Sequence, residues 1–300
     1  MLLVNLGTPA APTAAAVREY LREFLSDPKV VGLPRFLWLP LLHLVVLPTR
    51  SPKSAHKYQQ VWTREGSPLA VHTARQVKLL ADKTGWQVEY AMRYGSPSIA
   101  SGLAKFPSVP IVLPLYPQFA ESATGTVLDL VRGRPAVRDF HDHPAYIDAL
   151  AAVLRRHRKS AKLVMSFHGL PKRGGEEYER QCRQTGLLLS KALNLKDDEW
   201  MVTFQSRFGA AKWLEPYTQP TLEELARGGT TEVDVFCPGF VSDCLETLEE
   251  LGITARAAFL AAGGRELNLI PCLNEAPEWI AAMERIASET ATRPYQPHAG

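Results

Sequence analysis

Short runs of aliphatic and β-branched residues alternate along the chain with longer segments in which apolar residues recur every three or four positions. The short runs fit buried strands, and the longer segments fit helices with one apolar face. Regular alternation of strands and helices predicts an α/β fold in which helices cover a parallel sheet on both faces. The expected strands are residues 2–6, 86–94, 109–116, 161–168, 200–206, 232–239 and 266–272.

The helical segments carry local start and stop signals. In residues 13–25, Val17, Tyr20 and Phe24 lie on one apolar stripe, and Pro28 follows the last turn. The remaining helices are expected at residues 68–83, 122–132, 145–156, 176–193, 218–226, 243–251 and 276–287.

A polar turn at residues 141–144, with the sequence HDHP, lies near the middle of the chain, and we expect a domain boundary there. A length of 300 residues with 46% hydrophobic and 22% charged residues fits a folded protein of two domains, or one α/β unit built as two halves. The net charge is only +3, with 34 Lys and Arg against 31 Asp and Glu, so a nucleic-acid partner is not expected.

The cysteines Cys182, Cys237, Cys244 and Cys272 are far apart in sequence, which favours a reducing cytosolic setting over a disulfide-stapled secreted domain. The opening sequence MLLVNLGTP lacks a basic segment and a long apolar core, so we interpret it as the first strand and not as a targeting signal. The longest apolar stretch, residues 36–47, is too short to cross a bilayer, although it can lie on one.

Ligands of open α/β sheets bind beyond the carboxyl ends of the strands, so the residues that end each strand are the first candidates for chemistry. His168 ends one expected strand and is followed by Gly169 and Pro171, which make a rigid turn. Such a turn aims the imidazole out of the strand end, where it suits a general base or a metal ligand. The alternative is a partly buried histidine bonded to a backbone carbonyl.

A second strand end leads into a helix that is expected to begin near Asp243. Glu246 and Glu250 share a helical face with Asp243, and a line of carboxylates can bind a divalent cation. The alternative is a capping box, in which Asp243 caps the helix and Glu246 completes the box three residues later. Both interpretations stay open, because the sequence does not show whether His168 faces Glu246.

Aromatic residues concentrate in the loop after the strand expected at residues 200–206. Phe204, Phe208, Trp213 and Tyr217 either close a core or form the wall of a pocket for a flat apolar ligand. The chain has no G-x-G-x-x-G after a strand, no Walker loop and no G-x-S-x-G, which excludes the common dinucleotide, nucleotide and hydrolase motifs.

Residues 33–48 form an apolar segment, which Arg50, Lys53 and Lys57 follow closely. Apolar residues edged by cations fit an element at a lipid surface, or the lip of a pocket for an apolar molecule that bears carboxylates. A helix buried against the sheet is an equal alternative.

Taken together, these residues resemble the ferrochelatase family, whose members insert ferrous iron into a porphyrin to make haem. The resemblance covers nearly the whole chain, and its most specific motifs are SFHGLP at 166–171 and SDCLETLEE at 242–250. The first holds the family's metal-site histidine, here His168, and the second its metal-site glutamate, here Glu246. Further matching segments are LLVNLGTP at 2–9, RSPKSAHKY at 50–58, MRYGSP at 92–97, LYPQF at 115–119, TFQSRFG at 203–209 and WLEPYT at 213–218.

The resemblance implies two similar Rossmann-like halves, doubly wound around parallel sheets, with a cleft between them. Residues 1–142 with 275–293 would form the first domain, which includes the apolar lip at 33–48, and residues 143–274 would form the second domain with the metal site. Asp243 and Glu250 would extend an acidic track from that site. The porphyrin would lie against Leu6, Tyr58, Tyr94, Tyr116, Trp213 and Phe240, with Arg50 near a propionate or the entrance.

It also implies a lyase of the metal-chelatase class that inserts ferrous iron into protoporphyrin IX with release of two protons, the last step of haem b biosynthesis. Metallation needs a base for the pyrrole protons, ligands that release the metal again, and walls that distort the macrocycle. His168 fits proton acceptor or ligand, and Glu246 fits ligand or proton carrier. The expected localisation is cytoplasmic with peripheral membrane contact at the lip, and enzymes of the haem pathway are expected partners.

Two positions depart from parts of the family. Cys244 stands where animal relatives carry a second histidine, which puts a proton relay at that position in doubt. No cysteine follows Cys272, so the C-terminal cysteine group that holds a [2Fe-2S] cluster in some relatives is missing. We expect no such cluster, no tightly bound cofactor and an enzyme of the bacterial type.

The choice of porphyrin is a hypothesis. Protoporphyrin IX is preferred to coproporphyrin III because the apolar lip suits an apolar edge, and four carboxylates would need more cations. The alternatives are iron insertion into coproporphyrin III, a carrier that binds porphyrin or haem without chemistry, and a chelatase for another tetrapyrrole and metal.

Overall fold

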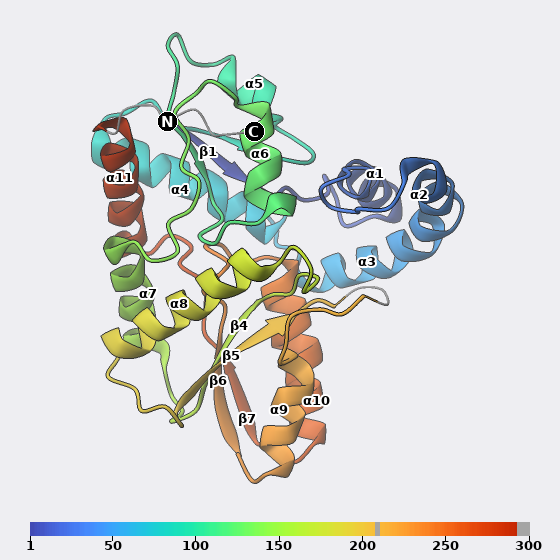
Figure 1. The fold of residues 1–300 in the computed structure, drawn as a ribbon, viewed down its shortest axis with the longest axis vertical. Helices are drawn as coiled ribbons and strands as arrows, with labels where there is room; N and C mark the ends of the chain where they lie inside the picture. The colour runs from blue at the N-terminus through green and yellow to red at the C-terminus, as the bar shows by residue number, and fades with distance from the viewer. Residues whose placement is uncertain (208–210, 293–300) are drawn as a thin grey trace. The chain divides into compact units, whose positions relative to one another are not determined.

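The computed structural model describes residues 1–207 and 211–292. The described chain forms two compact units, and most of their helices and strands are labelled in Figure 1. Unit 1 contains residues 1–116, 120–139 and the described residues from 283 on, and unit 2 contains residues 117–119 and 140–282. The domain limits that the resemblance implies stay a prediction, and residue 293 of the returning segment lies outside the described residues.

Within the described residues, unit 1 contains a parallel sheet in the order β2-β1-β3. Its strands are β1 (Leu2–Asn5), β2 (Glu89–Met92) and β3 (Val112–Pro114). Leu3 of β1 pairs with Tyr90 on one side and with Leu113 on the other. The side chains of Leu2, Leu3 and Val4 are completely buried, as expected for a central parallel strand that is covered on both faces.

Some helices of unit 1 begin or end at residues with recognisable capping chemistry. The hydroxyl of Thr13 accepts a hydrogen bond from the Ala16 N–H at 3.3 Å at the start of α1. Gly85 adopts φ 71° after α4, and its N–H donates to the carbonyl of Ala81. The helices are α1 (Ala14–Leu25), α2 (Arg35–Leu41), η1 (Leu42–Val46), α3 (Leu47–Val61), α4 (Pro68–Thr84), α5 (Ile99–Leu103), η2 (Glu121–Gly125) and α6 (Thr126–Leu130), where η denotes a π-helix.

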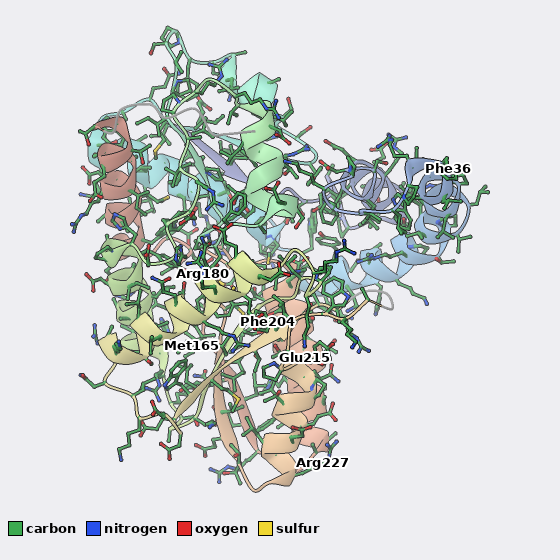
Figure 2. The ribbon with its side chains drawn as sticks, viewed as in Figure 1. Phe36, Met165, Arg180, Phe204, Glu215 and Arg227 are labelled. Carbon is green, nitrogen blue, oxygen red and sulfur yellow. The ribbon has the colours of Figure 1, made fainter. Side chains whose placement is uncertain are left out.

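The apolar segment at residues 33–48 is helical through α2 and η1, but its alternative interpretation as a helix buried against the sheet is wrong. Phe36 and Leu44 are each 77% exposed, and Phe36 extends away from α2 (Figure 2). Trp38 anchors the segment, since it is buried and its indole N–H donates to the Leu25 carbonyl at 2.6 Å. The segment contacts α1 and α3 and leaves most of its apolar side chains uncovered.

Unit 2 contains a parallel sheet in the order β5-β4-β6-β7 among its described residues. Its strands are β4 (Leu163–His168), β5 (Trp200–Gln205), β6 (Glu232–Phe236) and β7 (Glu266–Leu269). Met165 pairs with Val202 of β5 and with Phe236 of β6, which places β4 in the interior of the sheet. Each expected strand is therefore confirmed, although most are shorter than the apolar run that predicted them.

The helices of unit 2 flank this sheet. Helices α8 and α9 both contact β5, and α10 contacts β7 and runs beside α9 (Figure 1). The helices are α7 (Pro144–His157), α8 (Glu176–Ala192), α9 (Thr218–Arg227), η3 (Glu246–Ala255), α10 (Arg256–Ala261) and α11 (Pro277–Thr292), of which α11 continues into unit 1. The helix expected at residues 243–251 thus begins later, is a π-helix, and continues as α10.

The two sheets share one winding pattern. In each unit the first strand is central, the second strand lies on one side of it and the third strand lies on the other. The predicted α/β class with two doubly wound parallel halves is confirmed. This pattern creates a switch point in each sheet, between β1 and β3 in unit 1 and between β4 and β6 in unit 2, where ligands of such sheets bind.

Candidate functional site in unit 2

The switch point of the second sheet carries His168 and the segment that follows β6. His168 is the last residue of β4 and is partly exposed. The ring of Phe240, four residues after β6 ends, lies with its centroid 6.4 Å from the His168 ring centroid. Both residues were predicted from sequence, and the fold brings them together at the edge where ligands are expected.

The hydrogen bond of His168 defines which ring nitrogen is free to act in the neutral imidazole. Its Nδ1 lies 2.7 Å from the carbonyl oxygen of Gly169, and because a carbonyl only accepts, Nδ1–H is the donor. The lone pair of the neutral ring is then on Nε2. The backbone contact expected for a structural histidine is therefore present, and it leaves Nε2 as the ring nitrogen without this bond.

The turn after His168 requires glycine. A Cβ atom on Gly169 would lie 2.6 Å from the carbonyl oxygen of Gln205, a distance that real Cβ atoms do not show. The close approach is held by the Gly169 N–H, which donates to that same carbonyl at 2.7 Å. The end of β4 is thereby fixed against the end of β5.

Glu250 of η3 lies against the end of β5. Its carboxylate accepts one hydrogen bond from the Ser206 N–H at 2.7 Å and another from the Ser206 hydroxyl at 2.5 Å. Burial raises the pKa of Glu250, and the nearby charge of Glu246 adds to the rise. The Ser206 hydrogen bonds and the charge of His168 act in the opposite direction on this pKa.

Glu246 is the first residue of η3 and is partly exposed. Its backbone carbonyl accepts a hydrogen bond from the side-chain amide of Gln205 at 2.8 Å. Gln205, which holds Glu246 in this way, pairs with His168 across the sheet, and the next residue, Ser206, holds Glu250. The predicted metal-site pair and one member of the predicted acidic track therefore lie at the same edge of the sheet.

Asp243 has a different environment. Its carboxylate accepts hydrogen bonds from the Thr247 hydroxyl at 2.8 Å and from the Asn274 amide at 2.6 Å, and the residue is buried. The helix begins after Leu245 without a side-chain cap, so the capping box between Asp243 and Glu246 is wrong. The Asp243 N–H, which the box would have bonded to the Glu246 side chain, donates to the side-chain oxygen of Asn274 at 2.8 Å instead.

Cys244 lies beside Glu246 and is buried. Burial raises the pKa of its thiol well above the usual value, and the charge of Glu246 adds to this rise. Among the described residues, no three His, Cys, Asp or Glu side chains come close enough together to hold a metal ion.

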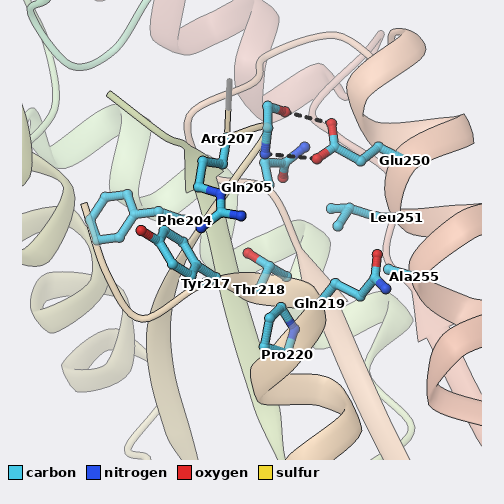
Figure 3. Close-up of a pocket in the computed structure, with 11 residues that line it drawn as sticks. Phe204, Gln205, Arg207, Tyr217, Thr218, Gln219, Pro220, Glu250, Leu251 and Ala255 are labelled. Carbon is cyan, nitrogen blue, oxygen red and sulfur yellow. Dashed lines mark hydrogen bonds between the residues drawn. The ribbon is translucent and has the colours of Figure 1, made fainter. Parts of the chain in front are cut away.

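A cavity of about 330 Å³ opens beside Glu250 (Figure 3). In the close-up, Glu250 lies on one side of it and the Arg207 guanidinium, 5.1 Å from the Tyr217 ring centroid, lies on the other. Trp213, predicted to contact porphyrin, is half-buried and forms an isolated β-bridge with Pro171. Its indole N–H is buried without a hydrogen-bond partner within the described residues. Phe208, expected among the same loop aromatics, lies outside the described residues.

The residues of unit 1 that are predicted to contact porphyrin differ in where they lie and in how deeply they are buried. Leu6 follows β1 and Tyr116 follows β3, so both flank the switch point of the first sheet. Tyr94 is instead 1% exposed and donates its hydroxyl to Asp27 at 3.0 Å. Tyr58 is buried on α3 and Arg50 is partly exposed on the same helix.

Sequence reasoning missed Gln205, Ser206 and Asp27. Gln205 and Ser206 end an expected strand, which is the signal that would have selected them. Asp27 carries no comparable signal, because its partners Arg93 and Tyr94 are distant in sequence.

The fold is shared with chelatases of known structure. SirB from Bacillus subtilis with Fe³⁺ has a TM-score of 0.54 and 15% identity, covering 74% of this chain and 89% of that chain. The sirohydrochlorin chelatase SirB from Bacillus subtilis subspecies spizizenii in complex with cobalt has a TM-score of 0.54 and 13% identity, covering 98% of this chain and 95% of that chain. At 13% and 15% sequence identity, these structural similarities define only the fold class of the chain.

Sequence comparison defines the family. A profile of the ferrochelatase family matches residues 1–291. The ferrochelatase of Azoarcus sp. (strain BH72) is 54% identical over 98% of this chain and 90% of its own length, and that of Aromatoleum aromaticum is 53% identical over 95% and 86%. The chain belongs to the ferrochelatase family, and it is a metal chelatase of the lyase class, an enzyme that inserts ferrous iron, its substrate, into a porphyrin.

Proposed function

We propose that this ferrochelatase inserts ferrous iron into protoporphyrin IX to give protohaem, the last step of haem b biosynthesis. The observation that carries the choice of porphyrin is the exposed apolar surface of α2 and η1. Between residues 33 and 48 the only Lys, Arg, Asp or Glu is Arg35. An apolar porphyrin edge suits such a surface, whereas the four carboxylates of coproporphyrin III would need more cations.

His168 and Glu246 divide the chemistry of the metal site. Iron insertion replaces the two pyrrole protons of the free base by one Fe²⁺ ion, so two protons must leave. Nε2 of neutral His168 accepts a pyrrole proton or ligates the incoming iron, and the Glu246 carboxylate ligates iron or carries a proton. The hydrogen bond from Nδ1–H to Gly169 supports this role, because it presents the basic nitrogen and fixes the ring.

Glu250 extends the acidic track from this site. Its charge neighbours are His168 and Glu246, and the cavity beside it provides space for a hydrated ion. Asp243 was proposed as a second member, but its hydrogen bonds to Thr247 and Asn274 favour a structural role in holding the segment before η3.

The porphyrin contacts stay a proposal, which rests on the resemblance to the ferrochelatase family. Leu6 and Tyr116 beside one switch point and Phe240 beside the other are the best-supported contacts, because ligands of doubly wound sheets bind there. Arg50 would face a propionate. The full proposed set is Leu6, Arg50, Tyr58, Tyr94, Tyr116, Trp213 and Phe240.

We propose that the exposed apolar side chains of residues 33–48 touch the membrane surface, from which an apolar porphyrin is taken and to which haem is returned. No helix in the described parts of the chain is long and apolar enough to span a bilayer. A cytoplasmic enzyme with peripheral membrane contact at this segment and contacts to haem-pathway enzymes is proposed on the resemblance to the ferrochelatase family.

The test is anaerobic Fe(II) insertion into protoporphyrin IX and into coproporphyrin III under identical conditions, followed by loss of porphyrin fluorescence and growth of haem absorbance. Higher kcat/KM with protoporphyrin IX is expected. Faster metallation of coproporphyrin III would overturn the substrate choice, and tight binding of either porphyrin without metallation would favour the carrier.

A further inference from the structure

Ser206 adopts a backbone conformation that is uncommon for a residue with a side chain. It follows β5 directly and has φ 64°, in the left-handed region that glycine occupies without steric cost. Strained residues of this kind persist where surrounding interactions fix them, and they concentrate at functional sites. The interactions that fix Ser206 are its two hydrogen bonds to the Glu250 carboxylate.

The left-handed turn is what allows both groups of Ser206 to reach one carboxylate. The N–H donates to Oε1 at 2.7 Å and the hydroxyl donates to Oε2 at 2.5 Å, so each carboxylate oxygen receives one donor (Figure 3). A carboxylate held through both oxygens has a fixed orientation. Glycine would satisfy the backbone at this position but would lack the hydroxyl.

The preceding residue holds the same π-helix at a second point. The side-chain amide of Gln205 donates to the Glu246 carbonyl at 2.8 Å, and its oxygen accepts from the Ser166 hydroxyl at 2.7 Å. Ser166 is bonded in turn to Thr218, whose hydroxyl is 2.9 Å from that of Thr203. These side chains are all buried, so the chain of hydrogen bonds is rigid and costly to break.

Two consecutive residues at the end of β5 thus hold two residues of η3 that are four positions apart. We propose that Ser206 is a positioning residue for iron: it orients the Glu250 carboxylate in the acidic track, with Gln205 fixing the backbone of Glu246 beside it. This inference rests on the proposed function of the track. It assigns to Ser206 no contact with porphyrin.

The test uses two variants of Ser206 that separate the hydroxyl from backbone strain. Ser206→Ala and Ser206→Gly both remove the hydroxyl, but only Ser206→Gly also relieves the left-handed strain. Ser288→Ala is the matched control, since its exposed hydroxyl donates to the Glu284 carbonyl of its own helix. Thermal unfolding of each variant precedes the kinetics, and if Ser206→Ala fails to fold, Ser206→Gly decides the question alone.

Steady-state metallation is measured with Fe(II) varied at saturating porphyrin, and then with porphyrin varied at saturating Fe(II). Both Ser206 variants are expected to raise the KM for Fe(II) about tenfold, the effect of losing one hydrogen bond to a charged group. Their KM for porphyrin should stay within about twofold of the wild type. An unchanged KM for Fe(II), or an equal rise in both KM values, would overturn the proposal.

A measurement without porphyrin separates this inference from the proposed function. Calorimetric titration of the protein with Fe(II) alone should show weaker binding for both Ser206 variants than for the wild type and Ser288→Ala. If the wild type metallates no porphyrin, the proposed function fails, while the titration still decides whether Ser206 orients a metal-binding carboxylate. Equal Fe(II) affinity in all four proteins would remove Ser206 from that role.

Discussion

His168 and Gln205 pair in register as the last residues of neighbouring parallel strands, and the N–H after His168 donates to the Gln205 carbonyl at 2.7 Å. The His168 imidazole and Ser206 therefore lie at the same edge of the sheet, where Ser206 donates to Glu250. The proposed base and the proposed iron track are therefore held by adjacent strand ends, and a small displacement of one strand end would disturb both.

Replacing the proposed base should abolish most turnover. His168→Ala removes Nε2, and a general base typically contributes about 10²- to 10⁴-fold in rate, so kcat should fall by that order. His157→Ala, on an exposed residue at the end of α7, is the control. The measurement is anaerobic haem formation, with porphyrin binding followed separately by fluorescence. Wild-type kcat in His168→Ala would show that another group takes the proton.

The raised pKa of Glu250 makes a prediction about stability and pH. The folded pKa lies above the ordinary value of 4.5, so the folded wild type binds this proton more tightly than the unfolded chain does. Wild-type stability relative to Glu250→Gln should be greatest below about pH 4.5 and should fall as the pH rises through the folded pKa. Thermal unfolding of both proteins across this range tests it, and a Tm difference that does not vary with pH would contradict it.

The Asp27 carboxylate should be a major stabilising group in unit 1. It accepts hydrogen bonds from Arg93 at 2.5 Å and from Tyr94 at 3.0 Å, and the Arg93 and Asp27 side chains are only 15% and 12% exposed. Asp27→Asn leaves a mostly buried guanidinium without its counter-charge, which should lower the free energy of unfolding by about 2–4 kcal/mol.

Asp129 provides the matched comparison for Asp27. Its ion pair with Lys29 is more exposed, at 38% and 34%, so Asp129→Asn should cost less than about 1 kcal/mol. Denaturant unfolding of both variants makes the comparison. Equal losses of unfolding free energy in the two variants would mean that burial does not make the Asp27 ion pair more stabilising.

The apolar lip should control binding to lipid vesicles. Phe36→Ser with Leu44→Ser removes two side chains that are each 77% exposed, so the fold should lose little stability. If both side chains enter the interface, their removal should weaken vesicle binding by roughly tenfold or more. Leu79→Ser, on an exposed leucine of α4, is the control, and sedimentation with vesicles is the measurement. Undiminished binding of the double variant would place the membrane contact elsewhere.

The hydrophobic pattern was sufficient for the strands because several of them, such as β1, β3 and β4, are short runs of buried, mostly apolar residues. The pattern predicted the start of a helix less well where the chain departs from α-helical geometry. The carboxylates after β6 fit an ordinary capped helix by spacing, yet the helix begins at Glu246 as a π-helix and Asp243 turns to Asn274 instead. Asn274 is 31 residues from Asp243, and local spacing contains no information about such a partner.

The apolar segment at residues 33–48 shows the same limit. Its composition fits a membrane lip and a buried helix equally well, because both need apolar side chains. The fold excludes the buried helix, because Phe36 and Leu44 stay exposed while the Trp38 indole N–H donates to the Leu25 carbonyl, and the membrane contact stays a prediction.

The sequence by itself determined the alternating α/β class, the strand end that carries His168, the segment after a strand that carries Glu246, and membership of a chelatase family, since periodicity and motifs are local properties of the chain. Only the tertiary structure decided which nitrogen of His168 is free, that Ser206 holds Glu250, and that Asp243 and Tyr94 are engaged in internal hydrogen bonds. Those features depend on groups from different strands and helices meeting at one place, and such meetings follow from the winding of the sheets and not from spacing along the chain.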